Sequence, residues 1–455
     1  MAETAAAVPD LEHVLEAADA QRRLSNQAHF SYAMLSEGLS ACLIFASSEE
    51  ILLRPLISPT ASHPAFEVLA QRVYLSATLG DGGELERAFG RKKIARIKAP
   101  ANWENQGTGR RFFVFPDLVK GLDEEAVPEF VRDQITTFNK AVLLAPNKRA
   151  RDRLVAAVKP AEMACWQADE SDDAAEHFLS AFTGVLALAN RYDGIDLPDH
   201  ACRLVVLAGS PNGAHLQERF LYQSLGAHVV LNERIRTRIT QGAGRATRNS
   251  ADYAAVLMLG RDLREFCMLQ EHRSAMFPEL RAEITFGLEY SDVSKVEVLE
   301  NLQHFRGQDE EWQGANRQIR AARDETPRIA LPGTEHLSNA VQFEVSAINA
   351  AWQGDWSRAV DQAKKVVEAL PGTPEIRRYQ ALWQYMLASW AVIAFRSDGQ
   401  SHWKDLADKH FADARTAAGG TQWLRDITTN AAQLLASTTS IAGPIEDPLD
   451  QCHLA

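Results

Sequence analysis

Short apolar runs separated by amphipathic stretches dominate the chain between about residues 112 and 260. Runs of this length without polar alternation are typical of strands buried on both faces of a parallel sheet. The stretches between them, such as 148–158 and 214–225, have helical periodicity. The alternation therefore predicts a doubly wound α/β lobe. Its expected strands are 112–115, 141–145, 184–188, 203–208 and 254–259.

The chain has different patterns on either side of this lobe. Two apolar runs, CLIFAS and ILLRPLIS, flank Glu49 and Glu50, which predicts a strand pair between residues 41 and 58. A further strand is expected at 72–76. The last hundred residues contain no strand run, and the stretch 350–359 resembles one tetratricopeptide unit, with Gly354 in the turn between two helices. We therefore predict an all-helical domain there.

Tryptophans are concentrated in this predicted helical domain. Large aromatic side chains are far more often packed in a core than arranged around a ligand, so we expect a core role here. The tryptophans concerned are Trp352, Trp356, Trp383, Trp390 and Trp403.

Composition narrows the function classes. The 455 residues carry a formal net charge of -12, so the whole chain is not a nonspecific nucleic-acid binder, and phosphate contacts need local basic strips. Five cysteines lie far apart without a CxxC pair, which argues against a disulfide framework, a zinc site or a cysteine-ligated metal cluster. With no signal-peptide pattern and no long apolar run, we expect a cytoplasmic protein that does not enter membranes.

The strongest chemical signal is QGAGRATR at residues 241–248, between a predicted helix and a strand. Gly244 would let the backbone approach a phosphate. Arg245 and Arg248, about one helical turn apart, could point at the same anion and stabilise charge on a transferring phosphoryl group. The alternative is a solvated arginine pair on a helix.

Two further motifs follow strands at the sheet edge where ligands of open α/β sheets bind. In ANRYDGIDLP, residues 189–198, Gly194 allows a tight turn, and Asp193 and Asp196 could orient catalytic groups or accept hydrogen bonds from a sugar. In isolation, an Asp-Gly turn with two solvated carboxylates explains this motif better. LLAPN ends at Asn147 in a polar turn.

A weaker motif, LSATL at residues 75–79, lies earlier in the chain. Its Ser76 and Thr78 would form hydrogen bonds across an interface between lobes and so transmit the nucleotide state. Basic residues follow LSATL and LLAPN, and either phosphate contacts or a solvated charged face would explain them. They are Arg87, Arg91, Lys92, Lys93, Arg96 and Lys98 in the first group, and Lys148, Arg149, Arg151 and Arg153 in the second.

The ordered set LSATL, LLAPN, NRYDGIDLP and QGAGRATR resembles motifs III to VI of superfamily 2 helicases, and is most similar to the XPD/DinG branch. The resemblance spans about residues 40–265. It implies a second RecA-like lobe in which Arg245 and Arg248 face ATP and Gln241 positions the phosphate or its water. It also implies nucleotide contacts from Gly244, Gly194, Asp193 and Asp196, and coupling through Ser76 and Thr78. The nucleic-acid contacts would be Asn147, Lys148, Arg149, Arg91 and Lys92, with single-stranded DNA preferred.

The sequence also departs from this family. It contains no Gly-Lys pair, hence no Walker A loop, and its Asp-Glu pairs all follow LSATL, where a Walker B pair would precede it. ATP and Mg²⁺ would therefore need a Walker A/B lobe in trans or in a longer chain. The competing hypothesis is a non-catalytic binding module for nucleic acid or protein, with a protein partner at the helical domain.

The expected domain organisation has five parts. Residues 1–90 hold a helical segment, the strand pair and the end of a first helicase lobe. Residues 91–265 form the second RecA-like lobe. A helical linker over 266–335, a helical-hairpin domain over 336–440 and a tail over 441–455 complete the chain.

Overall fold

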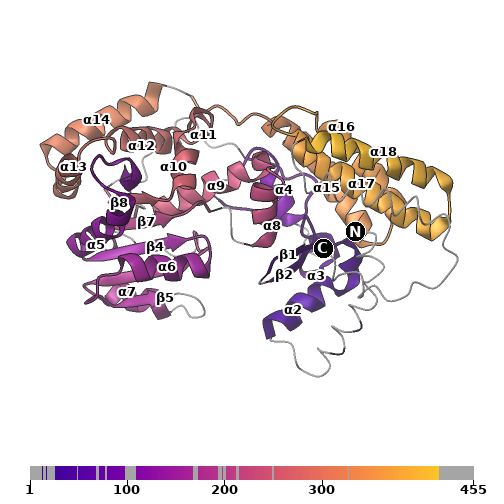
Figure 1. Cartoon of the computed structure of the whole chain (residues 1–455), viewed down its shortest axis with the longest axis horizontal. Coiled ribbons are helices and arrows are strands. Elements are labelled where there is room, and N and C mark those ends of the chain that lie inside the picture. Colours follow the sequence, from indigo (N-terminus) through magenta and orange to yellow (C-terminus); the bar gives the residue numbers. More distant parts are fainter. Residues whose placement is uncertain are drawn as a thin grey trace.

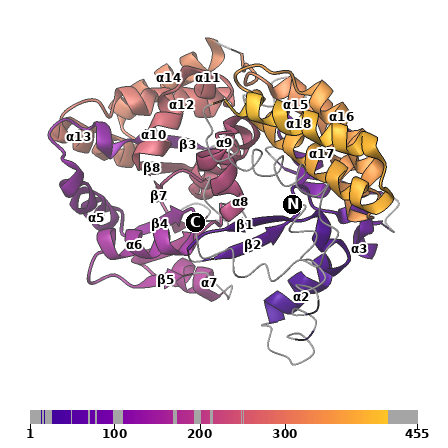
Figure 2. The same cartoon turned by 45° about the vertical axis from the view of Figure 1, so that its right-hand side comes forward.

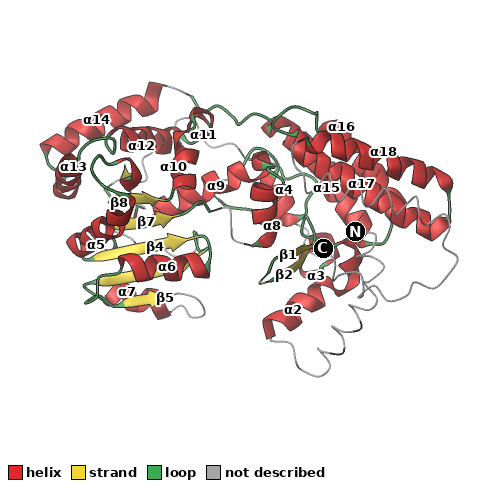
Figure 3. Ribbon diagram, in the orientation of Figure 1, coloured by secondary structure: helices red, strands yellow, loops and turns green. Residues whose placement is uncertain are grey.

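The computed structural model describes residues 13, 17, 26–48, 50–67, 71–76, 79–97, 109–167, 173–192, 197, 201–211, 215–247, 249, 251–325 and 327–419. Figure 1 shows an α/β lobe at one end, a bundle of long helices at the other, and a small N-terminal hairpin below the bundle. Figure 3 shows that the main sheet lies wholly within the first of these bodies.

Six parallel strands form the sheet of the lobe, in the order β3-β8-β7-β4-β6-β5. Every pairing within it is parallel, for example Leu143 of β4 opposite Val206 of β7 and Ala187 of β6. The lobe is thus the predicted α/β, RecA-like fold. The strands are β3 (Arg110–Val114), β4 (Lys140–Ala145), β5 (Cys165–Gln167), β6 (Gly184–Ala189), β7 (Leu204–Ala208) and β8 (Tyr253–Leu259).

Alternate residues of each strand enter two separate cores, one on either face of the sheet. Val142 and Leu144 of β4 belong to one core, whereas Ala141 and Leu143 belong to the other. Each face needs its own helices because a parallel sheet buries both faces. The first core contains residues from α7 (Asp173–Ser180), α9 (His228–Ala243) and α10 (Arg261–Met268), and the second from α5 (Val127–Phe138) and α6 (Lys148–Val158).

The segment predicted as a helical linker over 266–335 is helical, but it packs on the lobe. It contains α11 (Gln270–Ser274), α12 (Pro278–Glu289), α13 (Lys295–Gly307) and α14 (Glu310–Glu325). Gly287 of α12 lies so close to β3 that a Cβ there would be 2.4 Å from the carbonyl oxygen of Phe113. Sequence periodicity shows that a segment is helical, not what covers it, so the prediction missed this packing.

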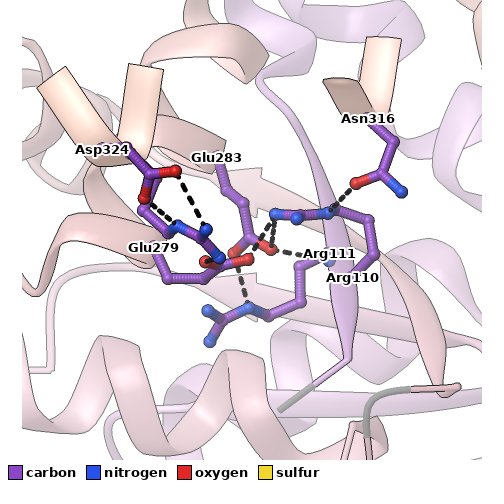
Figure 4. A network of polar contacts seen from close by, with 7 residues as sticks. Arg110, Arg111, Glu279, Glu283, Asn316 and Asp324 are labelled. Carbon is purple, nitrogen blue, oxygen red and sulfur yellow. Dashed lines mark hydrogen bonds and ion pairs between the residues drawn. The ribbon is translucent and has the colours of Figure 1, made fainter. Parts of the chain in front are cut away.

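A buried ion-pair network fixes α12 and α14 to β3 (Figure 4). Glu283 is fully buried on α12, and its carboxylate forms ion pairs with the guanidinium groups of Arg110 at 2.9 Å and Arg111 at 2.7 Å. Arg110 also pairs with Glu279 at 2.6 Å, and Arg323 of α14 reaches the same carboxylate at 3.2 Å. Burial raises the pKa of Glu283, and the two guanidinium groups from β3 oppose that rise. These contacts place α12 and α14 in the wall of the lobe.

The N-terminal hairpin was predicted correctly. β1 (Leu43–Ala46) pairs with β2 (Ile51–Arg54) in antiparallel register. The strand predicted at 72–76 was wrong: Tyr74 packs on Phe89 with ring centroids 4.4 Å apart, but no described strand pairs with this segment. Around it lie α2 (Asn26–Leu35), η1 (Ser36–Ala41), η2 (Thr60–Ser62), α3 (Pro64–Glu67) and α4 (Glu84–Phe89).

Among the described residues, α15 to α18 form the C-terminal bundle, which Figure 2 shows from a second side. They are α15 (Thr334–Trp352), α16 (Trp356–Ala369), α17 (Arg377–Asp398) and α18 (Ser401–Ala418). Gly354 has φ of 72° in the turn between α15 and α16, which confirms the predicted hairpin. Trp352, Trp383, Trp390 and Trp403 are buried and Trp356 packs beside them, so the tryptophans are core residues. No helix of the described residues is long and apolar enough to cross a membrane.

Candidate functional site

The motif QGAGRATR lies where α9 ends and the short helix η8 (Gly244–Ala246) begins. Gly242 presses this end of α9 onto the sheet, because a Cβ there would be 2.9 Å from Leu207 Cδ2 and 3.1 Å from Tyr192 Cδ1. Leu207 belongs to β7, and Tyr192 follows β6. The end of α9 is therefore held close to the carboxyl ends of the parallel strands.

Arg245 joins this motif to the segment that follows β6. Its Nη2 donates a hydrogen bond to the carbonyl oxygen of Arg191 at 3.0 Å, and its own carbonyl oxygen accepts one from the amide of Leu197 at 3.3 Å. The side chain is buried within its own lobe, with 1% of its surface exposed. The motifs at 189–198 and 241–248, predicted to act together, are thus in direct contact. Contact with a nucleotide outside the lobe stays a prediction for Arg245.

Neither the backbone conformation of Gly244 nor its packing against the described residues requires glycine at this position. Its φ of -79° and ψ of -2° are ordinary helical values. A Cβ at this position would meet no atom of a described residue within 4 Å. The open space beside its backbone agrees with the predicted approach of a phosphate, since a side chain would fill that space.

Several predicted site residues fall outside the described residues. These are Thr78, Asp193, Gly194, Asp196 and Arg248. Gln241, on the last turn of α9, is half-buried, and Ser76 is exposed.

The basic residues predicted to contact nucleic acid have mixed surroundings. Asn147 caps α6, since its Oδ1 accepts a hydrogen bond from the amide of Ala150 at 2.9 Å. Lys148 and Arg149 are exposed on the first turn of α6. Lys92 is exposed, whereas Arg91 donates to the carbonyl oxygen of Phe66 at 2.6 Å.

Three of the other basic residues have carboxylate partners inside the protein. Arg87 pairs with buried Glu344 at 2.6 Å, Arg96 with Glu86 at 2.7 Å, and buried Arg151 with Asp152 at 2.7 Å. These three pairs explain those arginines without a nucleic-acid ligand.

A cluster of charged residues beside α9 was missed by the sequence analysis. Glu218, with 1% exposure on α8 (Leu216–Arg219), pairs with Arg234 at 2.6 Å and with Arg238 at 3.1 Å. His215, the N-cap of α8, lies 2.8 Å from Arg54 of β2. The sequence gives one hint of this cluster. Arg234 and Arg238 are one turn apart on α9, so they could share a carboxylate partner such as Glu218.

The electrostatics of this cluster favour a charged Glu218 and a neutral His215. Burial alone would raise the pKa of Glu218, but the guanidinium groups of Arg238 and Arg234 hold it below its usual value. Burial lowers the pKa of His215 to about 4. Arg234, Arg238 and Gln241 follow one another on α9 at helical spacings of four and three residues, so the cluster and the start of the motif lie on one face of α9.

Residues 137–271 match the family model for the helicase C-terminal domain. The matched region begins in α5 and ends in α11, so it contains β4 to β8 and Arg245. This part of the chain is therefore similar to the C-terminal domain of helicases. No curated protein is significantly similar in sequence.

Solved structures titled XPD_Helicase and XPD_APO are also similar to this chain. The first is 16% identical, with a TM-score of 0.38, over 52% of this chain and 46% of that one. The second is 15% identical, with a TM-score of 0.36, over 53% of each chain. This chain thus spans about half the length of these structures.

Proposed function

We propose that this chain supplies the C-terminal lobe of an ATP-dependent nucleic-acid helicase of the XPD/DinG type, acting on single-stranded nucleic acid with DNA preferred. The observation that carries the proposal is the contact between Arg245 and the segment after β6, at the end of α9, within the region that matches the helicase C-terminal domain. Ligands of open α/β sheets bind at the carboxyl ends of strands, and this contact lies there.

This edge of the lobe would receive the phosphates of ATP. The open space beside Gly244 and the guanidinium of the next residue suit an anionic phosphate. In this proposal Mg²⁺ would be held by the Walker A/B lobe, since this sequence carries neither Walker motif. Bound ATP would supply the γ-phosphoryl group that is transferred to water.

The chain's own residues would then stabilise charge on the phosphoryl group and position the phosphate or the attacking water. Arg245 and Arg248 would stabilise the negative charge that develops on the phosphoryl oxygens, as arginine fingers do. Gln241 would orient the phosphate or the attacking water. Arg245 must leave its bond to the carbonyl of Arg191, or share it, in order to reach a phosphate.

The experiment that tests this proposal is a native co-purification from the source cells, with the mass of every recovered chain determined. The proposal expects a Walker A/B lobe, either as a separate chain or within a longer polypeptide that contains this sequence. Recovery of the chain with no such lobe would overturn it.

The burial of Arg245 favours one alternative, a non-catalytic binding module in which this arginine only joins two segments of the lobe. Such a module would bind single-stranded nucleic acid with the same affinity whether nucleotide is present or not. The helicase lobe, combined with its ATP-binding partner, would bind with an affinity that depends on nucleotide.

A further inference from the structure

A cavity of the lobe lies at the amino edge of the sheet, remote from Arg245. It has a volume of about 690 Å³ and is lined by α5, α13 and residues at the starts of β4, β7 and β8. Asn139 directly precedes β4, Arg203 directly precedes β7, and Tyr253 begins β8. In Figure 1, α5 and α13 lie next to each other at this end of the lobe. Strands of five to seven residues separate it from the opposite edge by about 15–20 Å.

Two arginines face this cavity, and each is supported by an aromatic ring. The guanidinium of Arg203 lies 4.1 Å from the centroid of the Tyr253 ring, and that of Arg306 lies 5.4 Å from the centroid of the Phe138 ring. Stacking of this kind fixes the plane of a guanidinium group and leaves its N–H groups directed outward. Two oriented cations at one cavity indicate an anionic ligand.

The donors of these two arginines are largely unused. Nη1 of Arg203 donates to the carbonyl oxygen of Tyr253 at 2.8 Å, and its nearest carboxylate, Asp252, lies 3.8 Å away. The part of the chain that the structure describes offers the Arg306 guanidinium no hydrogen-bond acceptor. No carboxylate is among the residues that line the cavity. The positive charge there is therefore not neutralised from within the cavity.

Amide side chains complete the lining. Gln134 is 96% buried, yet its side chain makes no hydrogen bond to another described residue, and it borders the cavity. Asn139 and Gln303 border the cavity too. The amide of Gln134 is open to the cavity, so water or a ligand can satisfy its hydrogen bonds there. Amides both donate and accept, so they suit the edge of a heterocyclic base.

We propose that this cavity binds a small molecule of the mononucleotide class, a phosphate joined to a planar heterocycle. Arg203 and Arg306 bind the phosphate, the stacked guanidinium–ring pairs present flat surfaces for the base, and Gln134 contacts the edge of the base. The volume falls in the range of small-ligand pockets, about 300–1,000 Å³, which favours a mononucleotide over a polymer. The site is independent of the nucleotide-facing edge at Arg245.

The test is calorimetric titration of the purified full chain with AMP, with inorganic phosphate and with adenosine. AMP binds to the wild-type chain, and both other probes bind at least tenfold more weakly. Arg203→Gln and Arg306→Gln each weaken AMP binding tenfold or more. The matched control is Arg320→Gln, an exposed arginine of α14 outside the cavity, which leaves the affinity unchanged.

Arg306 is exposed, so its variant folds even if the Arg203 variant does not. Arg245→Gln separates this inference from the proposed helicase site, because it leaves AMP binding unchanged if the cavity is the site. The proposal is overturned by absence of AMP binding at millimolar concentration, or by equal affinity for phosphate or adenosine alone. The proposal is also overturned if Arg245→Gln abolishes AMP binding while the two cavity variants bind AMP as tightly as the wild type.

Discussion

Gly242 and Gly244 lie two residues apart in the same motif, yet they have different surroundings. Gly242 faces Leu207 and Tyr192 at distances too short for a Cβ, whereas the space beside Gly244 is open. Close packing of α9 on the sheet therefore explains the first glycine. The second needs an explanation outside the described residues, and approach of a phosphate is the one we propose.

Alanine at these two positions separates packing from function. Gly242→Ala is expected to lower the free energy of unfolding by about 1–3 kcal/mol, because the added methyl overpacks a well-filled core. Gly244→Ala is expected to leave it unchanged or raise it by up to about 1 kcal/mol, since alanine favours helical backbone. Urea unfolding of both variants measures this difference. Equal destabilisation would show that the open space beside Gly244 has been misread.

His215 makes the stability of the lobe depend on pH. Its pKa in the folded protein is about 4, below the ordinary histidine value near 6.5, so it contributes stability above pH 6.5 that is lost as pH falls toward 4. The slope from this group reaches about 1.4 kcal/mol per pH unit. His215→Asn keeps an N-cap for α8 and removes the titration, so the unfolding free energy should fall less steeply over this range. An unchanged slope would contradict the assignment.

At the scale of elements, α12 is attached to the sheet by charge as well as by apolar packing. Glu283 lies between Arg110 and Arg111 at a fully buried position, and Glu279 connects the same network to α14. Removing one member of such a group leaves the others charged and buried. We therefore expect this network to hold α12 and α14 against β3.

Glu283→Gln is expected to destabilise the lobe by about 3 kcal/mol, because two arginines lose the same carboxylate. Faster hydrogen exchange in β3 and α12 should accompany the loss. Glu300→Gln, on the exposed face of α13, serves as the control and should be neutral. If both variants behave alike, the network does not hold α12 in place.

The elements were predictable where a pattern of buried residues marks them. The runs that became β4, β6, β7 and β8 are apolar along their whole length, so the sequence alone located them. β5 was missed because it has three residues at the edge of the sheet. The segment at 72–76 alternates like a strand, but alternation does not supply a neighbouring strand.

The candidate site was only partly predictable for a related reason. A contiguous motif identified Gln241, Gly244 and Arg245, whereas the contact of Arg54 with His215 joins residues 161 positions apart. No local pattern reveals such a pair. The same holds for the amino-edge cavity, whose lining comes from segments that only the fold brings together.

At the scale of the whole molecule, the helical bundle is joined to the N-terminal region. Gly38 lies against the ring of Trp352 so closely that a Cβ would overlap it, and Arg87 of α4 pairs with buried Glu344 of α15. One continuous core also runs from the sheet into the bundle. The bundle is therefore placed to hold the N-terminal region beside α9, which α4 contacts.

The central claim is that Arg245 completes an ATP site on a partner lobe. The measurement that tests it most directly is the single-turnover rate of ATP hydrolysis by the complex with its Walker A/B lobe, in wild type and in Arg245→Ala. If Arg245 acts as an arginine finger, the rate should fall about 10³-fold or more while ATP affinity changes little. Arg320→Ala is the control for loss of a surface charge. An unchanged hydrolysis rate in a correctly folded Arg245→Ala complex would contradict the claim and leave Arg245 a structural residue of its own lobe.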